Sequence, residues 1–181
     1  VAFYRSLVEL KNTLAAVLPD TALSVEITDN RPQDYPIPFP AAKKAPLDMS
    51  EVLQTVAAVN RDSDRGRDLT MVANLGRLIV NGDDPIEGLQ RLLAAEVPFE
   101  GVIMSGAGAS KDGFMDSHNS HLDPASGFTE ADGLRCAELI KAAGAQKSFV
   151  GTKCSVAKAD GQVTTADVLA AQAELLGKID V

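Results

Sequence analysis

The chain has 181 residues, a length typical of one domain. Its 17 basic and 25 acidic residues give a net charge of −8 at pH 7, which argues against nucleic-acid binding through phosphate contacts. No stretch approaches the roughly 18 apolar residues of a membrane-spanning helix, and no basic segment precedes an apolar one at the start, so neither a membrane span nor a signal peptide is predicted. Cys136 and Cys154 match no zinc or redox spacing, and we expect reduced thiols in a cytoplasmic protein.

Predicted helices and strands alternate along the chain. Residues 2–18 are predicted to be a helix, because their apolar residues recur on one face. Residues 30–48 hold five of the nine prolines and are predicted to be a long loop, and 106–128 a second one. Further strands and helices follow from alternation and from capping residues: strands at 23–28, 70–74, 101–105 and 149–154, and helices at 49–60, 85–96, 129–143 and 164–176.

This order of elements predicts a single α/β domain over residues 1–181 with a parallel sheet. Helices between successive strands act as right-handed crossovers. Four such units can form half of a TIM (β/α)8 barrel, or a small open flavodoxin-like sheet. Either architecture places its chemistry after the carboxyl ends of the strands, where the two long loops are predicted.

The first strand ends in two carboxylates, Glu26 and Asp29. Carboxylates at such a position can bind a divalent metal, move a proton or contact a substrate. Lys153, in the last strand, is either an ion-pair partner of Glu26 or a catalytic amine. Asp29 is also compatible with ordinary turn chemistry.

Polar residues also follow the two middle strands. Asn74 and Arg77 come after the second strand and could bind a substrate hydroxyl or an anionic group, although Arg77 could equally pair with an acid of the protein. Ser105 ends the third strand and opens a run of small residues. That run has no phosphate-loop ending, so no nucleotide cofactor is predicted.

Both histidines lie in one loop. His118 and His121 follow Asp116 within six residues, a grouping that could bind a metal or supply a general base. The alternative is a solvated turn. We assign a catalytic role to His118 and substrate contacts to Asp116 and His121.

The motifs around these residues, taken in order, resemble a known grouping. Val-Glu-Ile-Thr-Asp-Asn, Ala-Asn-Leu-Gly-Arg, Ile-Met-Ser-Gly-Ala, Asp-Gly-Phe-Met-Asp-Ser-His and Val-Gly-Thr-Lys-Cys-Ser resemble the C-terminal part of an uncharacterised bacterial family grouped with xylose-isomerase-like TIM barrels. The resemblance covers about Tyr4 to Leu176 and implies strands five to eight of a barrel. A complete barrel takes about 250 residues, so we expect a homo-oligomer or pairing with a missing N-terminal half.

The resemblance also implies chemistry on a sugar. Many proteins of that superfamily bind a divalent metal through Glu, Asp, His and Glu at the strand ends, and Glu26 stands at the first of these positions. Asn74, Ser105 and Lys153 stand where further ligands are expected, so Mg²⁺, Mn²⁺ or Zn²⁺ would have an incomplete ligand set. The expected function is a sugar isomerase or epimerase with Glu26, His118 and Lys153 as catalytic residues. The alternatives are a carbohydrate-binding barrel without turnover and a purely structural half-barrel.

Overall fold

A computed structural model describes residues 2–28, 47–110, 113–145, 149–155 and 163–179. Its main feature is a four-stranded parallel sheet with the order β1-β2-β3-β6. The strands are β1 (Ser24–Glu26), β2 (Thr70–Asn74), β3 (Phe99–Met104) and β6 (Phe149–Thr152). All four predicted strands are confirmed, with shorter bounds for the first and last.

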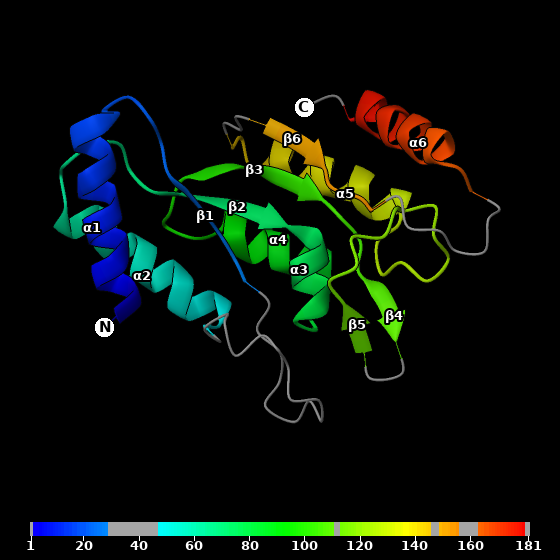
Figure 1. The fold of residues 1–181 in the computed structure, drawn as a ribbon, viewed down its shortest axis with the longest axis horizontal. Coiled ribbons are helices and arrows are strands. Elements are labelled where there is room, and N and C mark those ends of the chain that lie inside the picture. The colour runs from blue at the N-terminus through cyan, green and yellow to red at the C-terminus, as the bar shows by residue number, and fades with distance from the viewer. Residues whose placement is uncertain (1, 29–46, 111–112, 146–148, 156–162, 180–181) are drawn as a thin grey trace.

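Helices connect and cover these strands, as the alternating pattern predicts. They are α1 (Ala2–Val17), α2 (Met49–Asp62), α3 (Leu75–Val80), α4 (Pro85–Leu93), α5 (Glu130–Ala142) and α6 (Thr165–Lys178). Capping residues fix where several begin: Asp48, Thr129 and Thr164 each form a capping box. In Figure 1 the arrowheads of β2, β3 and β6 point the same way, and α4 and α5 lie behind the strands.

The two faces of the sheet differ in polarity. Ile27, Met71, Ala73, Val102 and Met104 are buried in one cluster with side chains of the helices. Their sequence neighbours point to the opposite face, where Ser24 Oγ lies 2.7 Å from Thr70 Oγ1. This is the alternation predicted for residues 23–28, with the polar residues on one face and the apolar residues on the other.

Three elements were not predicted. Residues 75–80 form the short helix α3, directly after β2. Within the predicted loop 106–128, β4 (Gly108–Ser110) and β5 (Gly113–Met115) form an antiparallel pair, which lies beyond the arrowheads of the main sheet in Figure 1. The predicted loop at 30–48 lies almost entirely outside the described residues, as does Asp29. No described helix is long and apolar enough to cross a membrane.

Candidate functional site

The candidate site lies at the carboxyl ends of the parallel strands. Glu26 is the last residue of β1, and Asn74 is the last residue of β2. Asp116 and His118 come from the segment after β5. Ligands of parallel α/β proteins bind at this edge of the sheet, so the positions agree with those expected from the sequence.

Asn74 connects the first two strands and starts the next helix. Its Nδ2 donates to Glu26 Oε1 at 2.8 Å, and its Oδ1 accepts from the backbone N–H of Arg77 at 3.4 Å. The side chain is 2% exposed. Because Asn74 is the N-cap of α3, the residue predicted to bind substrate also fixes the direction in which Arg77 leaves the strand.

Arg77 lies between two carboxylates. Its Nε is 2.5 Å from Glu26 Oε1, and its Nη2 is 3.5 Å from Asp116 Oδ2. The Arg77 side chain is 15% exposed, and those of Glu26 and Asp116 are 35% and 21% exposed, so the pairs are partly shielded from water and from salt. A partly buried guanidinium between two acids joins the end of β1 to the segment after β5.

His118 has the one positive φ of a non-glycine residue among the described residues, at 53°. Its Nδ1 lies 2.9 Å from Asp116 Oδ1. A left-handed backbone costs free energy for any residue with a Cβ, and such residues cluster at functional sites. At this distance the carboxylate attracts a protonated ring, although Nδ1 makes no aligned hydrogen bond among the described residues, and the contact does not use Nε2.

Hydrogen bonds connect the loop that carries His118 to the residues that follow β6. The carbonyl oxygen of His118 accepts from the backbone N–H of Ser155 at 2.7 Å, and Ser155 Oγ donates to the carbonyl of Ser117 at 2.8 Å. Ser117 Oγ in turn accepts from the backbone N–H of Gly108 at 2.7 Å and bonds to Asn119 Oδ1. These bonds hold the backbone at His118 next to the residues that follow β6.

Lys153 follows β6 and does not pair with Glu26, contrary to one of the two predicted roles. The ion pair of Glu26 is with Arg77. β1 and β6 are the opposite outer strands of the sheet, and three strand spacings of about 4.8 Å separate them by roughly 14 Å. Arg77 lies on the neighbouring segment and is therefore within reach.

Ser105 is buried beneath the start of α3. Its Oγ donates to the carbonyl of Gly106, and the side chain is 2% exposed. A Cβ on Gly76 would come within 2.6 Å of Ser105 Oγ, so only glycine lets α3 approach the end of β3 this closely. The described contacts of Ser105 are therefore packing contacts that position the helix of Arg77.

His121, the second predicted histidine, faces α6 instead of the cluster around Arg77. Its Nδ1 lies 3.1 Å from Nε2 of Gln172, which also donates to Ser120 Oγ. Burial lowers the pKa of His121 from its ordinary value, against the opposing effect of Glu130. Because an amide N–H must meet an unprotonated nitrogen, this contact favours neutral His121.

The described residues do not fit a divalent metal at Glu26. Oε1 already accepts from Asn74 and contacts the cationic Arg77, and a second cation there would be repelled. Within the described ranges, no group of three or more His, Cys, Asp or Glu side chains is placed to hold a metal ion. We therefore derive no step through a metal.

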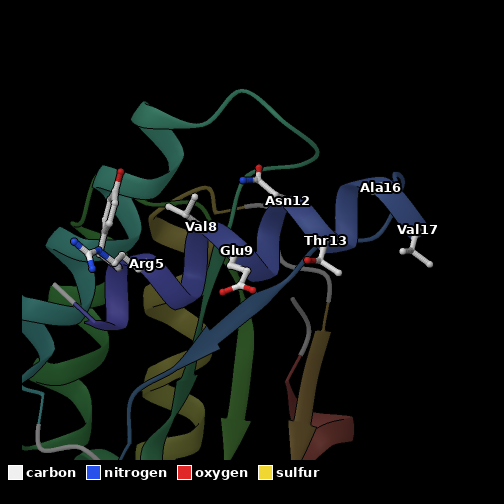
Figure 2. A pocket seen from close by; sticks show the side chains of 8 residues that line it. Arg5, Val8, Glu9, Asn12, Thr13, Ala16 and Val17 are labelled. Carbon is white, nitrogen blue, oxygen red and sulfur yellow. The ribbon is translucent and has the colours of Figure 1, made fainter.

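An open hollow of about 640 Å³ lies against α1 (Figure 2). Every residue that lines it belongs to α1, among them Val8, Glu9, Asn12 and Thr13. It holds none of the predicted site residues. A site for a small polar molecule needs polar groups that converge from several elements, and the strand-end cluster has them.

Several positioning residues were missed in the sequence. Ser117, Asn119 and Ser155 hold the histidine loop, and Gly76 lets α3 approach β3. Gln172 had a detectable signal, because it interrupts the buried stripe of Val168 and Leu175 on α6. A polar residue within an apolar stripe indicates a buried hydrogen-bond partner.

Comparison with known proteins gives a family without a described activity. A family model with the description Domain of unknown function (DUF4862) matches residues 1–166. The match includes every predicted site residue and ends at the first turn of α6. No curated protein matches the chain.

Proposed function

Since the chain belongs to the family Domain of unknown function (DUF4862), we propose from its own residues that it is a proton-transfer enzyme acting on a sugar or a sugar derivative. The reaction class is isomerisation or epimerisation. The observation that carries the proposal is the Asp116–His118 pair, with 2.9 Å between Oδ1 and Nδ1 and a left-handed backbone at His118.

The proposed chemistry needs a base that removes a proton from carbon. His118 Nε2 removes a proton from the carbon next to a carbonyl group, and the electron pair of that bond forms an enediolate. Return of the proton to the neighbouring carbon on the same face gives the isomer, while the hydroxyl proton passes from one oxygen of the enediolate to the other. Epimerisation needs a proton on the opposite face of the same carbon, and there a water molecule is the donor while His118 keeps the proton it removed and later releases it to solvent. Asp116 orients the ring and stabilises the imidazolium that forms, as in other carboxylate–histidine pairs.

Arg77 has a positioning role in this proposal. It contacts Glu26 and Asp116 at once, so it fixes the carboxylate that orients His118. Glu26 then acts mainly by holding Arg77. This differs from the direct catalytic role expected from the sequence, and the reason is that Arg77 and Asn74 already contact Oε1 of Glu26.

We also propose that the sheet is half of a TIM-type barrel that resembles the xylose-isomerase-like proteins. Two observations support this: all four strands are parallel, and their order follows the chain without a reversal. An open doubly wound sheet reverses its strand order at its binding crevice. A barrel of eight strands would need four further strands beside β1 and β6.

The test of the activity is hydrogen exchange at carbon. The protein is incubated in D₂O with a panel of aldoses, ketoses and sugar acids, and NMR follows the loss of the C–H signal next to the carbonyl. We expect exchange with at least one sugar, and His118→Asn should slow it by about 10²–10⁴-fold, the usual contribution of a general base. Asparagine tolerates a left-handed backbone, so the loop conformation is retained.

His121→Asn is the matched control, because it changes the other histidine of the same loop. Its exchange rate should stay within about threefold of the unsubstituted protein, since His121 contacts α6. Equal rates in the His118→Asn variant and the unsubstituted protein would refute the assignment of the base.

One observation favours a second candidate, a carbohydrate-binding protein without turnover. The carboxylate of Glu26, which the resemblance assigns to a metal, is occupied by Arg77. This candidate predicts saturable sugar binding with no exchange at carbon, so the same panel, followed by calorimetry as well as NMR, separates the two.

A further inference from the structure

We propose that Lys153 binds an anionic group of the substrate, so that the substrate class is a sugar carrying a carboxylate or a phosphate. This inference rests on the proposed function for the position of the site. It adds that the substrate carries a negative charge, which proton transfer by the Asp116–His118 pair does not require.

The backbone places Lys153 at the edge of the sheet where the site lies. Its N–H donates to the carbonyl of Met104 at 3.0 Å, so it continues the ladder between β3 and β6 beyond Thr152. Alternation then puts its side chain on the face of Phe149 and Gly151. Glu26 is in register with Val72, Gly101 and Phe149 across the sheet, so Lys153 and Glu26 belong to the same face.

Lys153 is also close to the proposed base. Ser155, two residues further along, donates from its backbone to the carbonyl of His118 at 2.7 Å. This contact ties the backbone at His118 to the segment of Lys153. A single molecule of sugar size at this edge could contact the imidazole with one end and the ammonium with the other.

The charge of Lys153 has no counterpart in the described part of the chain. Its side chain is partly buried, yet no hydrogen bond or ion pair joins its Nζ to another described residue, whereas Lys11, Arg91 and Lys178 each have an acidic partner. The chain has 25 acidic residues against 17 basic ones, so partners are plentiful. An ammonium that no described carboxylate neutralises is available to an anionic group of a ligand.

The cluster around Arg77 does not serve that purpose. Its guanidinium is already balanced by Glu26 and Asp116, and together these three groups carry a net negative charge. An anionic substrate group would be repelled there and attracted at Lys153. The two ends of the site therefore differ in sign, which orients a substrate with one charged end.

The experiment measures binding and not turnover. Isothermal calorimetry compares glucuronate, glucose 6-phosphate, inorganic phosphate and uncharged glucose on the unsubstituted protein and on Lys153→Met, Lys153→Arg and Lys141→Met. Lys141 is an exposed residue near the end of α5 and serves as the matched control. We expect one of the two charged sugars to bind best and to lose about tenfold or more in affinity in Lys153→Met. Lys153→Arg should keep part of the affinity, and Lys141→Met should match the unsubstituted protein.

The outcomes distinguish a substrate carboxylate from a substrate phosphate. They also distinguish the role of Lys153 in binding from the proposed enzymatic activity. If glucuronate binds best, the substrate group is a carboxylate. If glucose 6-phosphate binds best and inorganic phosphate binds as well, the substrate group is a phosphate. Glucose binding as tightly as both charged sugars, binding of none of the probes at millimolar concentration, or unchanged affinity in Lys153→Met would overturn the proposal. Binding with these variant effects but no exchange at carbon would leave the inference standing and reject the proposed activity.

Discussion

Asp116 contacts Arg77 with one carboxylate oxygen and His118 with the other. Oδ2 lies 3.5 Å from Nη2 of Arg77, and Oδ1 lies 2.9 Å from Nδ1 of His118. The carboxylate thus lies between a guanidinium on one side and an imidazole on the other. Its removal should affect the chemistry more than the fold.

Asp116→Asn tests this arrangement. The amide keeps the shape of the side chain but loses the charge that stabilises the imidazolium, so exchange at carbon should fall by about 10²-fold or more. Binding of the best sugar should change by less than about threefold, because Lys153 and not Asp116 contacts its charged group in our proposal. An equal loss in binding and in exchange would show that Asp116 binds the substrate directly.

Glu26→Gln tests the role of the ion pair with Arg77. The substitution removes the charge nearest to a guanidinium that is 15% exposed, and we expect the free energy of unfolding to fall by about 1–2 kcal/mol. Exchange at carbon should also fall, because Arg77 then positions Asp116 less firmly. Urea unfolding and the NMR assay measure the two effects.

The control for Glu26→Gln is Glu138→Gln, which breaks the exposed pair of Glu138 with Arg135 on α5. Exposed pairs contribute little, so the free energy of unfolding should change by less than about 0.5 kcal/mol. If the two variants lost the same stability, the pair at the strand ends would be no more than a surface contact.

The sequence predicted which strand-end residues gather, but not how they pair. Glu26, Asn74, Arg77, Asp116 and His118 were identified because polar residues after parallel strands meet at one edge. The predicted ion pair between Lys153 and Glu26 was wrong, because Glu26 pairs with Arg77. Pairing depends on the distance across the sheet and not on charge alone. The contact of His121 with Gln172 depends on how α6 packs against the histidine loop. The sequence of that loop does not predict this packing.

Local signals explain the three missed elements of the fold. Asn74 is both the last residue of a strand and the N-cap of α3, so no turn residue separates the two elements. The strands β4 and β5 consist of Gly-Ala-Ser and Gly-Phe-Met, which lack the β-branched residues by which strands are identified. Helices with capping boxes, by contrast, were predicted close to their observed starts.

Gly101→Ala tests the packing of β6 on β3. A Cβ on Gly101 would lie 2.4 Å from the backbone oxygen of Phe149 and 3.0 Å from its ring. The strand would have to move, and we expect a loss of about 1–3 kcal/mol in the free energy of unfolding. Gly177→Ala on α6, where no atom lies within 4 Å of the new Cβ, should instead raise stability by about 0.5–1 kcal/mol. Equal effects at both positions would contradict the close approach of the two strands.

His121 should make stability depend on pH. Burial lowers its pKa in the folded protein below the ordinary value of 6.5, so the unfolded chain binds more protons as the pH falls through 6.5. The stabilisation from neutral His121, which contacts Nε2 of Gln172, is therefore complete above that pH and is lost as the pH falls toward the folded pKa.

Urea unfolding of the unsubstituted protein and of His121→Gln between about pH 7.5 and about pH 5 measures this dependence. The carboxylates that titrate in the same range are common to both proteins, so the difference in free energy of unfolding isolates His121. We expect that difference to shrink as the pH falls. A difference that stays constant over the range would show that folding does not favour neutral His121.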